Sequence, residues 1–139
     1  MKLKKINGKL VSVNLTKYSI DWDEPSKSKF QFAVKQFLKP FWRTHLCLEE
    51  FPVPGSLMKI DFLNATKRFV IEVQGAFHND YNKWIHKGSR TNFRKQMERD
   101  IKKERWCIEN DFLFIEIFPN DLDNLSRAWF LEKYGVDLI

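Results

Sequence analysis

Two apolar segments separated by a short polar turn place the strongest constraint on how this chain can fold. Residues 57–63 and 69–74 are rich in leucine, β-branched and aromatic residues, and the turn Asn64–Lys67 lies between them. This composition predicts two neighbouring antiparallel strands joined as a hairpin. The run FVIEV in the second segment is apolar enough for a central strand, so we expect a buried sheet here.

Three polar side chains interrupt this hairpin where a buried strand favours apolar residues. Asp61 lies in the first strand, while Glu72 and Gln74 share one face of the second because side chains alternate along a strand. The short turn should bring Asp61 next to Glu72. A buried carboxylate is costly unless it is paired or bound to a metal, and two acids near an open position can hold Mg²⁺ or Mn²⁺. The alternative is an edge strand with Glu72 and Gln74 in solvent, which the flanking apolar run disfavours.

The rest of the chain predicts a mixed α/β fold in which helices cover the faces of one central sheet. Apolar residues at three- and four-residue spacing indicate helices, and short β-branched or aromatic runs indicate strands. The expected elements are an N-terminal arm or strand (1–25), a helix (26–42) with Pro40 near its end, a strand (44–51), a loop (75–89), a helix (90–110), a strand (112–118) and a last helix (122–134) capped by Gly135.

The net charge of the chain arises in one segment. Residues 81–105 contain nine Lys or Arg and three acids, whereas the two signs balance elsewhere, so the formal charge of +6 belongs to this segment. Such a segment attracts a polyanion, most commonly nucleic acid, and a solvated basic helix is the alternative. The candidate DNA contacts are Lys83, Trp84, Lys87, Arg90, Arg94, Lys95 and Arg99. Trp84 could stack on a base or pack locally.

The helix expected at 90–110 should bury an apolar stripe. The stripe consists of Phe93, Met97, Ile101 and Ile108. Asp100 lies beside it, so this acid could support the two strand acids or instead pair with a neighbouring Arg or Lys. His78, in the loop before the helix, could deprotonate water or protonate a leaving oxygen, although a lone loop histidine is more often without such a role.

Composition excludes several classes of protein. No apolar run reaches the roughly 18 residues that would span a bilayer. The N-terminus is basic but has no apolar segment like that of a signal peptide, so we expect a cytoplasmic location. Cys47 and Cys107 fit reduced thiols, and together with three scattered histidines they lack the spacing of a zinc site.

The segment from Asp61 to Glu116 resembles the PD-(D/E)XK nucleases, and within them the branch of very-short-patch repair and EDxHD homing endonucleases. In that branch, a helix with an acid precedes a strand with a metal-binding Asp. The next strand ends in a residue followed by Gly and then His, and a helix with Arg-Asp leads into an apolar strand. The matching residues are Asp61, Gln74-Gly75, His78 and Arg99-Asp100. Gln31 stands where the branch has its helix acid, and Gln74 stands where the superfamily has a lysine.

The resemblance implies a restriction-endonuclease-like core and an Mg²⁺- or Mn²⁺-dependent enzyme that cuts or nicks double-stranded DNA. Asp61 and Glu72 would hold the metal. The other catalytic residues would be Gln74, His78, Asp100 and Gln31. Residues 26–118 would form the nuclease core of a single domain covering 1–139, with 119–139 as a C-terminal helix.

A phage or mobile-element nuclease of the homing type is the expected setting, and a homodimer or larger homo-oligomer would allow both strands to be cut. The second hypothesis is a non-catalytic DNA-binding protein on a decayed nuclease fold, which the glutamines at positions 31 and 74 favour. An RNA-binding or structural phage protein is the third.

Overall fold

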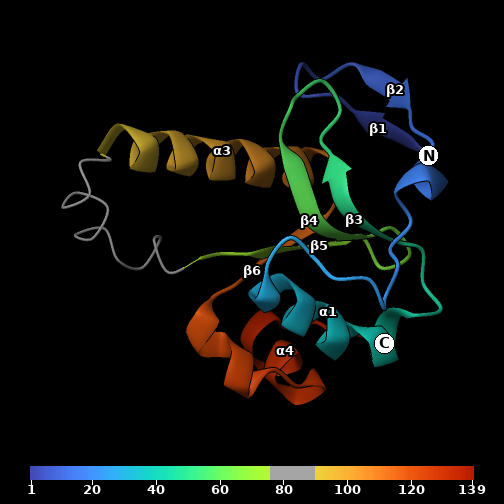
Figure 1. The fold of residues 1–139 in the computed structure, drawn as a ribbon. Helices are drawn as coiled ribbons and strands as arrows, with labels where there is room; N and C mark the ends of the chain where they lie inside the picture. The colour runs from blue at the N-terminus through green and yellow to red at the C-terminus, as the bar shows by residue number, and fades with distance from the viewer. Residues whose placement is uncertain (76–89) are drawn as a thin grey trace.

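The computed structural model describes residues 1–75 and 90–139, and within the second range it describes side chains from residue 94 onward. A four-stranded sheet forms its centre (Figure 1). The strands, in their order across the sheet, are β3 (Cys47–Pro52), β4 (Lys59–Asn64), β5 (Phe69–Val73) and β6 (Leu113–Ile117). β3, β4 and β5 pair antiparallel, whereas β5 and β6 pair parallel. The mixed α/β architecture predicted from the sequence is therefore confirmed.

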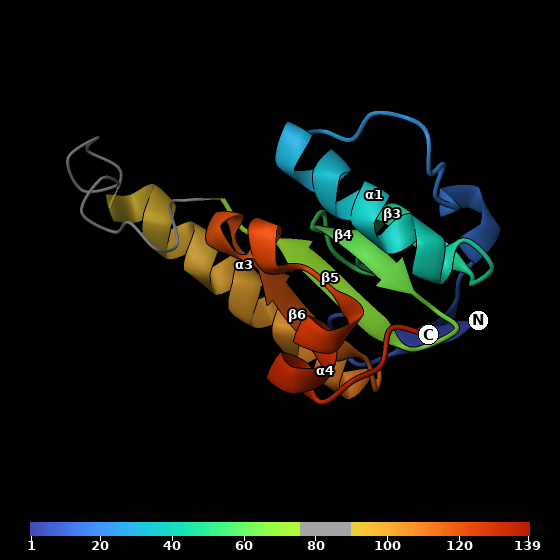
Figure 2. The ribbon, with the colours of Figure 1, turned by 90° about the horizontal axis from the view of Figure 1, so that it is seen from below.

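Helices cover both faces of the sheet, which gives three layers (Figures 1 and 2). α1 (Lys29–Trp42) and α4 (Arg127–Tyr134) pack on one face, and α3 (Arg90–Glu109) lies on the other. A small hairpin of β1 (Lys2–Lys4) and β2 (Leu10–Ser12) lies on the α3 side, followed by the 3₁₀ turn η1 (Leu15–Tyr18). Each face has its own apolar core, the first around Trp106 and the second around Trp42. None of the described helices is long and apolar enough to cross a membrane.

The helix expected at 26–42 begins at Lys29 because Ser28 caps it. The Ser28 hydroxyl accepts a hydrogen bond from the backbone N–H of Gln31 at 3.1 Å, which satisfies one of the free amides of the first turn. Pro40 lies inside the last turn, and the helix continues past it to Trp42. Val34, Leu38 and Trp42 form its buried face, at the spacing that the sequence predicts.

The last helix begins later than expected. Residues Pro119–Asn124 form a 3₁₀ turn, η3, in which the Asp121 carboxylate accepts the N–H of Phe118 at 2.9 Å. α4 starts after Ser126, whose hydroxyl accepts the N–H of Trp129 at 3.0 Å. Gly135 ends it with a φ of 68°, so the predicted glycine cap is confirmed. The segment 119–121 thus begins a 3₁₀ turn, and the cap that starts the α-helix is Ser126.

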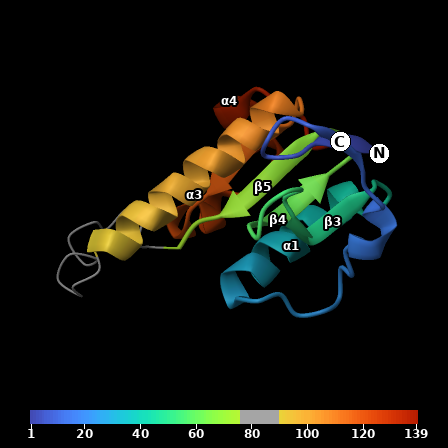
Figure 3. The ribbon, with the colours of Figure 1, turned by 90° about the horizontal axis from the view of Figure 1, so that it is seen from above.

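The buried face of α3 differs from the predicted stripe, and that prediction is wrong. Met97, Ile101 and Ile108 are exposed, whereas Trp106 and Cys107 are buried against the sheet. The indole of Trp106 donates to the carbonyl of Lys4 at 2.6 Å, which anchors the second half of the helix to β1. The first turns of α3 extend past the end of β5 (Figure 3).

Candidate functional site

Asp61 and Glu72 meet where the hairpin of β4 and β5 opens. The ladder pairs Phe62 with Ile71, and one more step would pair the two acids. At that step, carboxylate oxygens accept hydrogen bonds from the backbone N–H groups. The Asp61 N–H donates to Glu72 Oε2 at 2.7 Å, and the Val73 N–H donates to Asp61 Oδ2 at 2.9 Å. Both acids are buried, with 4% and 1% of their surface exposed. The structure therefore brings them together, as the short turn predicts.

A lysine contacts each of these two acids. Lys27, in the segment before α1, places its Nζ 3.0 Å from Asp61 Oδ1 and 3.6 Å from Glu50 Oε1. Lys103 of α3 donates to Glu72 Oε1 at 2.6 Å. Every carboxylate oxygen of Asp61 and Glu72 thus accepts from a described donor. The sequence analysis missed both lysines, and the one available signal was that Lys103 follows Asp100 by one helical turn.

Burial and like charge dominate the electrostatics of the pair. Burial raises the pKa of Glu72 to about 8, the Asp61 carboxylate adds to that rise, and Lys103 opposes it. Burial opposes the charged form of Lys27, but the charge and hydrogen bond of Asp61, together with the charges of Glu50 and Glu72, outweigh burial, so the pKa of Lys27 is raised. Glu72 thus carries a proton over a wider pH range than an ordinary glutamate.

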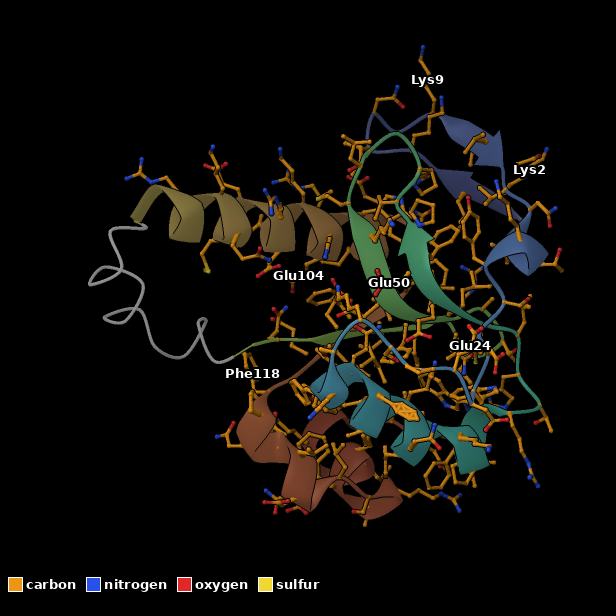
Figure 4. The ribbon with its side chains drawn as sticks, in the orientation of Figure 1. Lys2, Lys9, Glu24, Glu50, Glu104 and Phe118 are labelled. Carbon is orange, nitrogen blue, oxygen red and sulfur yellow. The ribbon has the colours of Figure 1, made fainter. Side chains whose placement is uncertain are left out.

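Gln31 lies beside this group but binds a different pair of acids. Its Nε2 donates to Glu49 Oε2 at 2.9 Å and to Glu50 Oε1 at 3.0 Å. Its Oε1 is buried and has no hydrogen-bond partner among the described residues. Lys35, which is fully buried, donates to Glu49 Oε1 at 2.8 Å. Gln31 is therefore connected to Asp61 only indirectly: it contacts Glu50, which is labelled in Figure 4, and Glu50 contacts Lys27, which contacts Asp61.

Two further candidates occupy the margins of the site. Gln74 follows the end of β5, where its N–H donates to the carbonyl of Ile117 at 2.8 Å and its side chain is buried. Asp100 is half-buried on α3 and accepts a hydrogen bond from Gln96 Nε2 at 3.1 Å. Asp100 lies one turn before Lys103, so it belongs to the inner face of the helix. The apolar stripe that was expected beside Asp100 does not lie on that face.

An open cleft with a volume of about 730 Å³ lies between α3 and the turn that joins β3 to β4. Its lining contains four cationic side chains and one acid. The lining residues are Lys27, Glu50, Ser56, Leu57, Met58, Lys59, Gln96, Arg99 and Lys103. The lysines that contact Asp61 and Glu72 thus form part of its wall. Among the predicted DNA contacts whose side chains the structure describes, Arg99 reaches this cleft, and Arg94 and Lys95 are exposed on the same helix.

Several predicted site residues lie outside the described part of the chain. They are His78, Lys83, Trp84 and Lys87. Arg90 begins α3, but its side chain is also outside the described set.

The oxygen donors at this site fit a hard divalent cation. Mg²⁺ takes oxygen ligands and is usually bound by one or two carboxylates plus water and phosphate. The carboxylates of Asp61 and Glu72 are donors of that kind. Among the described residues, no three His, Cys, Asp or Glu side chains are already arranged to hold a metal ion. To free a carboxylate oxygen for the ion, Lys27 would have to move from Asp61 and Lys103 from Glu72, and the Lys27 side chain is 58% exposed.

The cysteines take no part in this site. Cys47 and Cys107 are both buried and free, in the cores on opposite faces of the sheet. Burial raises the pKa of the Cys47 thiol to about 12 and raises that of Cys107 as well, so both thiols stay protonated at neutral pH.

Comparison with known proteins finds two viral relatives. The chain is 35% identical over 66 residues to uncharacterized protein 094L of frog virus 3, covering 48% of this chain and 43% of that protein. It is 29% identical over 87 residues to uncharacterized protein 033L of invertebrate iridescent virus 3, covering 63% of this chain and 44% of that protein. The chain thus spans less than half the length of each relative. No protein-family model and no solved structure matches it.

Proposed function

We propose that this chain is a metal-dependent DNA endonuclease with a PD-(D/E)XK-type core. The observation that carries the proposal is the pair of buried acids on adjoining strands, Asp61 and Glu72, whose lysine partners line a cationic cleft. Burying two carboxylates within a hairpin costs stability, and an enzyme that must bind a cation against a phosphodiester gains from them. The order of helix, three strands, helix and strand agrees with the resemblance drawn from the sequence.

Each residue of the site would have a role that fits its chemistry. Asp61 and Glu72 would hold Mg²⁺ or Mn²⁺, which polarises a phosphate and lowers the pKa of a bound water. Lys103, next to Glu72, would orient that water or stabilise charge that develops on the phosphate. Lys27 and Arg99 would contact phosphates in the cleft, while Arg94 and Lys95 would extend that contact along α3. Gln31 would hold Glu50, the second partner of Lys27, in place.

A virus or another mobile element is the setting we propose for this activity. Both relatives are viral proteins, which supports that setting. The homing-type activity and the homo-oligomer expected from the sequence are part of the same proposal.

Incubation with supercoiled plasmid in Mg²⁺ or Mn²⁺ tests the proposal. Nicked or linear product is expected from the wild type and should disappear in EDTA and in Asp61→Ala. Asp23→Ala is the matched control, because Asp23 is also paired with a lysine, Lys39 at 2.8 Å, but on the surface. Equal cleavage by Asp61→Ala and the wild type would remove Asp61 from the mechanism.

A non-catalytic DNA-binding protein is the second candidate function. It is favoured by the two lysines that already pair with the acids, and by the glutamines at positions 31 and 74. Calorimetric titration with Mn²⁺ separates the two candidates. The enzyme should show a site that is lost in Asp61→Ala, whereas the binding protein should show no such site while still shifting DNA in a gel.

A further inference from the structure

The turn between β3 and β4 presents an apolar side chain inside the cationic cleft. Leu57 is 99% exposed, the largest exposed fraction among the large apolar side chains that the structure describes. A single exposed leucine is ordinary on a protein surface. Leu57 is distinguished by its place, because it lines the cleft together with Lys27, Arg99 and Lys103.

The turn that carries Leu57 is held rigidly by backbone hydrogen bonds. The Val53 N–H donates to the Met58 carbonyl at 2.8 Å, and the Ser56 N–H donates to the Val53 carbonyl at 3.0 Å. The Ser56 hydroxyl also accepts the Met58 N–H at 2.9 Å. Because these bonds restrain the turn before any ligand arrives, the backbone at Leu57 loses little conformational freedom on binding.

The loop of the N-terminal hairpin packs against the turn. The Ile6 N–H donates to the Pro54 carbonyl at 3.0 Å. Gly55 has a φ of +82°, and a Cβ added there would lie 3.2 Å from Lys5 Cβ. The left-handed conformation and the close approach together favour glycine at this position. The sequence therefore builds a firm support for a leucine that contributes nothing to the core.

The charge around Leu57 indicates its partner. Lys59, two residues later, is exposed at the start of β4, and Lys27, Arg99 and Lys103 also line the cleft, together with the acid Glu50. A ligand that suits this wall must carry negative charge along its length and an apolar surface beside it. Nucleic acid has both, because phosphates run along its backbone and the bases offer apolar faces. Lys27 and Lys103 already pair with Asp61, Glu50 and Glu72, so an apolar peptide would leave the charges of Lys59 and Arg99 without an anionic partner from the ligand.

We propose that the β3–β4 turn is a DNA-contacting element in which Leu57 packs against a base step and Lys59 contacts a neighbouring phosphate. The inference rests on the proposed substrate, double-stranded DNA, but not on cleavage. It adds a second wall to the contact, opposite the basic residues of α3. Apolar side chains inserted at a base step partly unstack it and widen the angle between the bases.

The salt dependence of DNA affinity distinguishes the apolar contact of Leu57 from the phosphate contact of Lys59. Binding of a fluorescent duplex is measured in EDTA, so that no cleavage occurs, across a series of NaCl concentrations. Leu57→Ala should weaken binding about tenfold and leave the slope of log affinity against log salt unchanged, because no counterion is involved. Lys59→Ala should weaken binding at low salt and reduce that slope by about one. Leu131→Ala, which removes a 56% exposed leucine of α4 on the opposite face, is the matched control and should bind as the wild type does.

A duplex that contains 2-aminopurine reports the base contact directly. Its fluorescence should rise when the wild type binds and should rise less with Leu57→Ala. Wild-type affinity in Leu57→Ala, or an equal loss in Leu131→Ala, would overturn the proposal. If Leu57→Ala weakens binding in a protein that cuts no DNA, the contact stands and the nuclease proposal falls. If the protein cuts DNA and Leu57→Ala binds normally, the contact alone falls.

Discussion

The side chains of Asp61 and Glu72 each accept a hydrogen bond from the backbone of the opposite strand of the hairpin. The Glu72 carboxylate accepts the Asp61 N–H at 2.7 Å, and the Asp61 carboxylate accepts the N–H of the residue after Glu72 at 2.9 Å. Each acid therefore positions the strand that carries the other. A substitution at one position therefore changes the geometry of both.

Metal-free stability should fall as the pH rises from about 5 to 8. The pKa of Glu72 is raised from 4.5 to about 8, so the folded state binds more protons than the unfolded state across that window. Stability decreases with pH wherever the folded state holds the extra proton. We expect Glu72 to contribute a loss of roughly 3 kcal/mol over the window.

Urea unfolding of the wild type and Glu72→Gln in EDTA, at intervals from pH 5 to 8.5, measures this loss. The glutamine variant should show a flatter profile, and the difference between the two curves isolates Glu72. Parallel profiles would mean that Glu72 stays ionised throughout.

Lys103→Met should reduce metal-dependent cleavage by about 100-fold, since it removes the cation next to Glu72. Lys102→Met is the matched control, because Lys102 is the adjacent residue of α3 and is exposed. Both variants remove one positive charge, so DNA affinity should change to a similar degree in the two. Rates of plasmid nicking at saturating protein make the comparison, and equal rates in the two variants would contradict a role for Lys103 in the reaction.

Lys35→Met should destabilise the fold by about 3 kcal/mol, because it leaves the Glu49 carboxylate without its buried cation. Adding Glu49→Gln should restore part of that loss. Urea unfolding of the two single variants and the double variant gives the coupling energy. Additive effects in the cycle would show that the 2.8 Å contact between Lys35 and Glu49 does not stabilise the fold.

Gly135→Ala should lower the free energy of unfolding by about 1 kcal/mol, and backbone strain alone should cause this loss. Gly135 has a φ of 68°, and an added Cβ would meet nothing within 4 Å, so no steric clash contributes. Gly135→Asn should cost less, because asparagine tolerates the left-handed conformation better. Thermal unfolding of the two variants checks the order, and an asparagine variant less stable than the alanine variant would reverse this explanation.

The features that could be predicted from the sequence are those that depend on residues close together in it. The hairpin that carries Asp61 and Glu72 is one, because a short turn and two apolar runs are local signals. The lysine partners could not be predicted, since Lys27 lies 34 residues from Asp61 and Lys103 lies 31 residues from Glu72. The buried face of α3 was misjudged for a related reason. Apolar periodicity indicates a stripe, but Met97, Ile101 and Ile108 are exposed. The residues of α3 that face inward include Lys103 and Trp106, whose partners Glu72 and Lys4 are distant in the sequence.

The parallel pairing of β5 with β6 has a consequence for the order in which the site assembles. The two acids lie on a hairpin whose strands are joined by four residues, so they can meet early in folding with little loss of chain entropy. Lys103 lies in the long crossover that must close before β6 can pair with β5. We therefore expect Glu72 to acquire its counter-charge late, so that newly made chains pass through a stage in which the acids are paired but not yet neutralised.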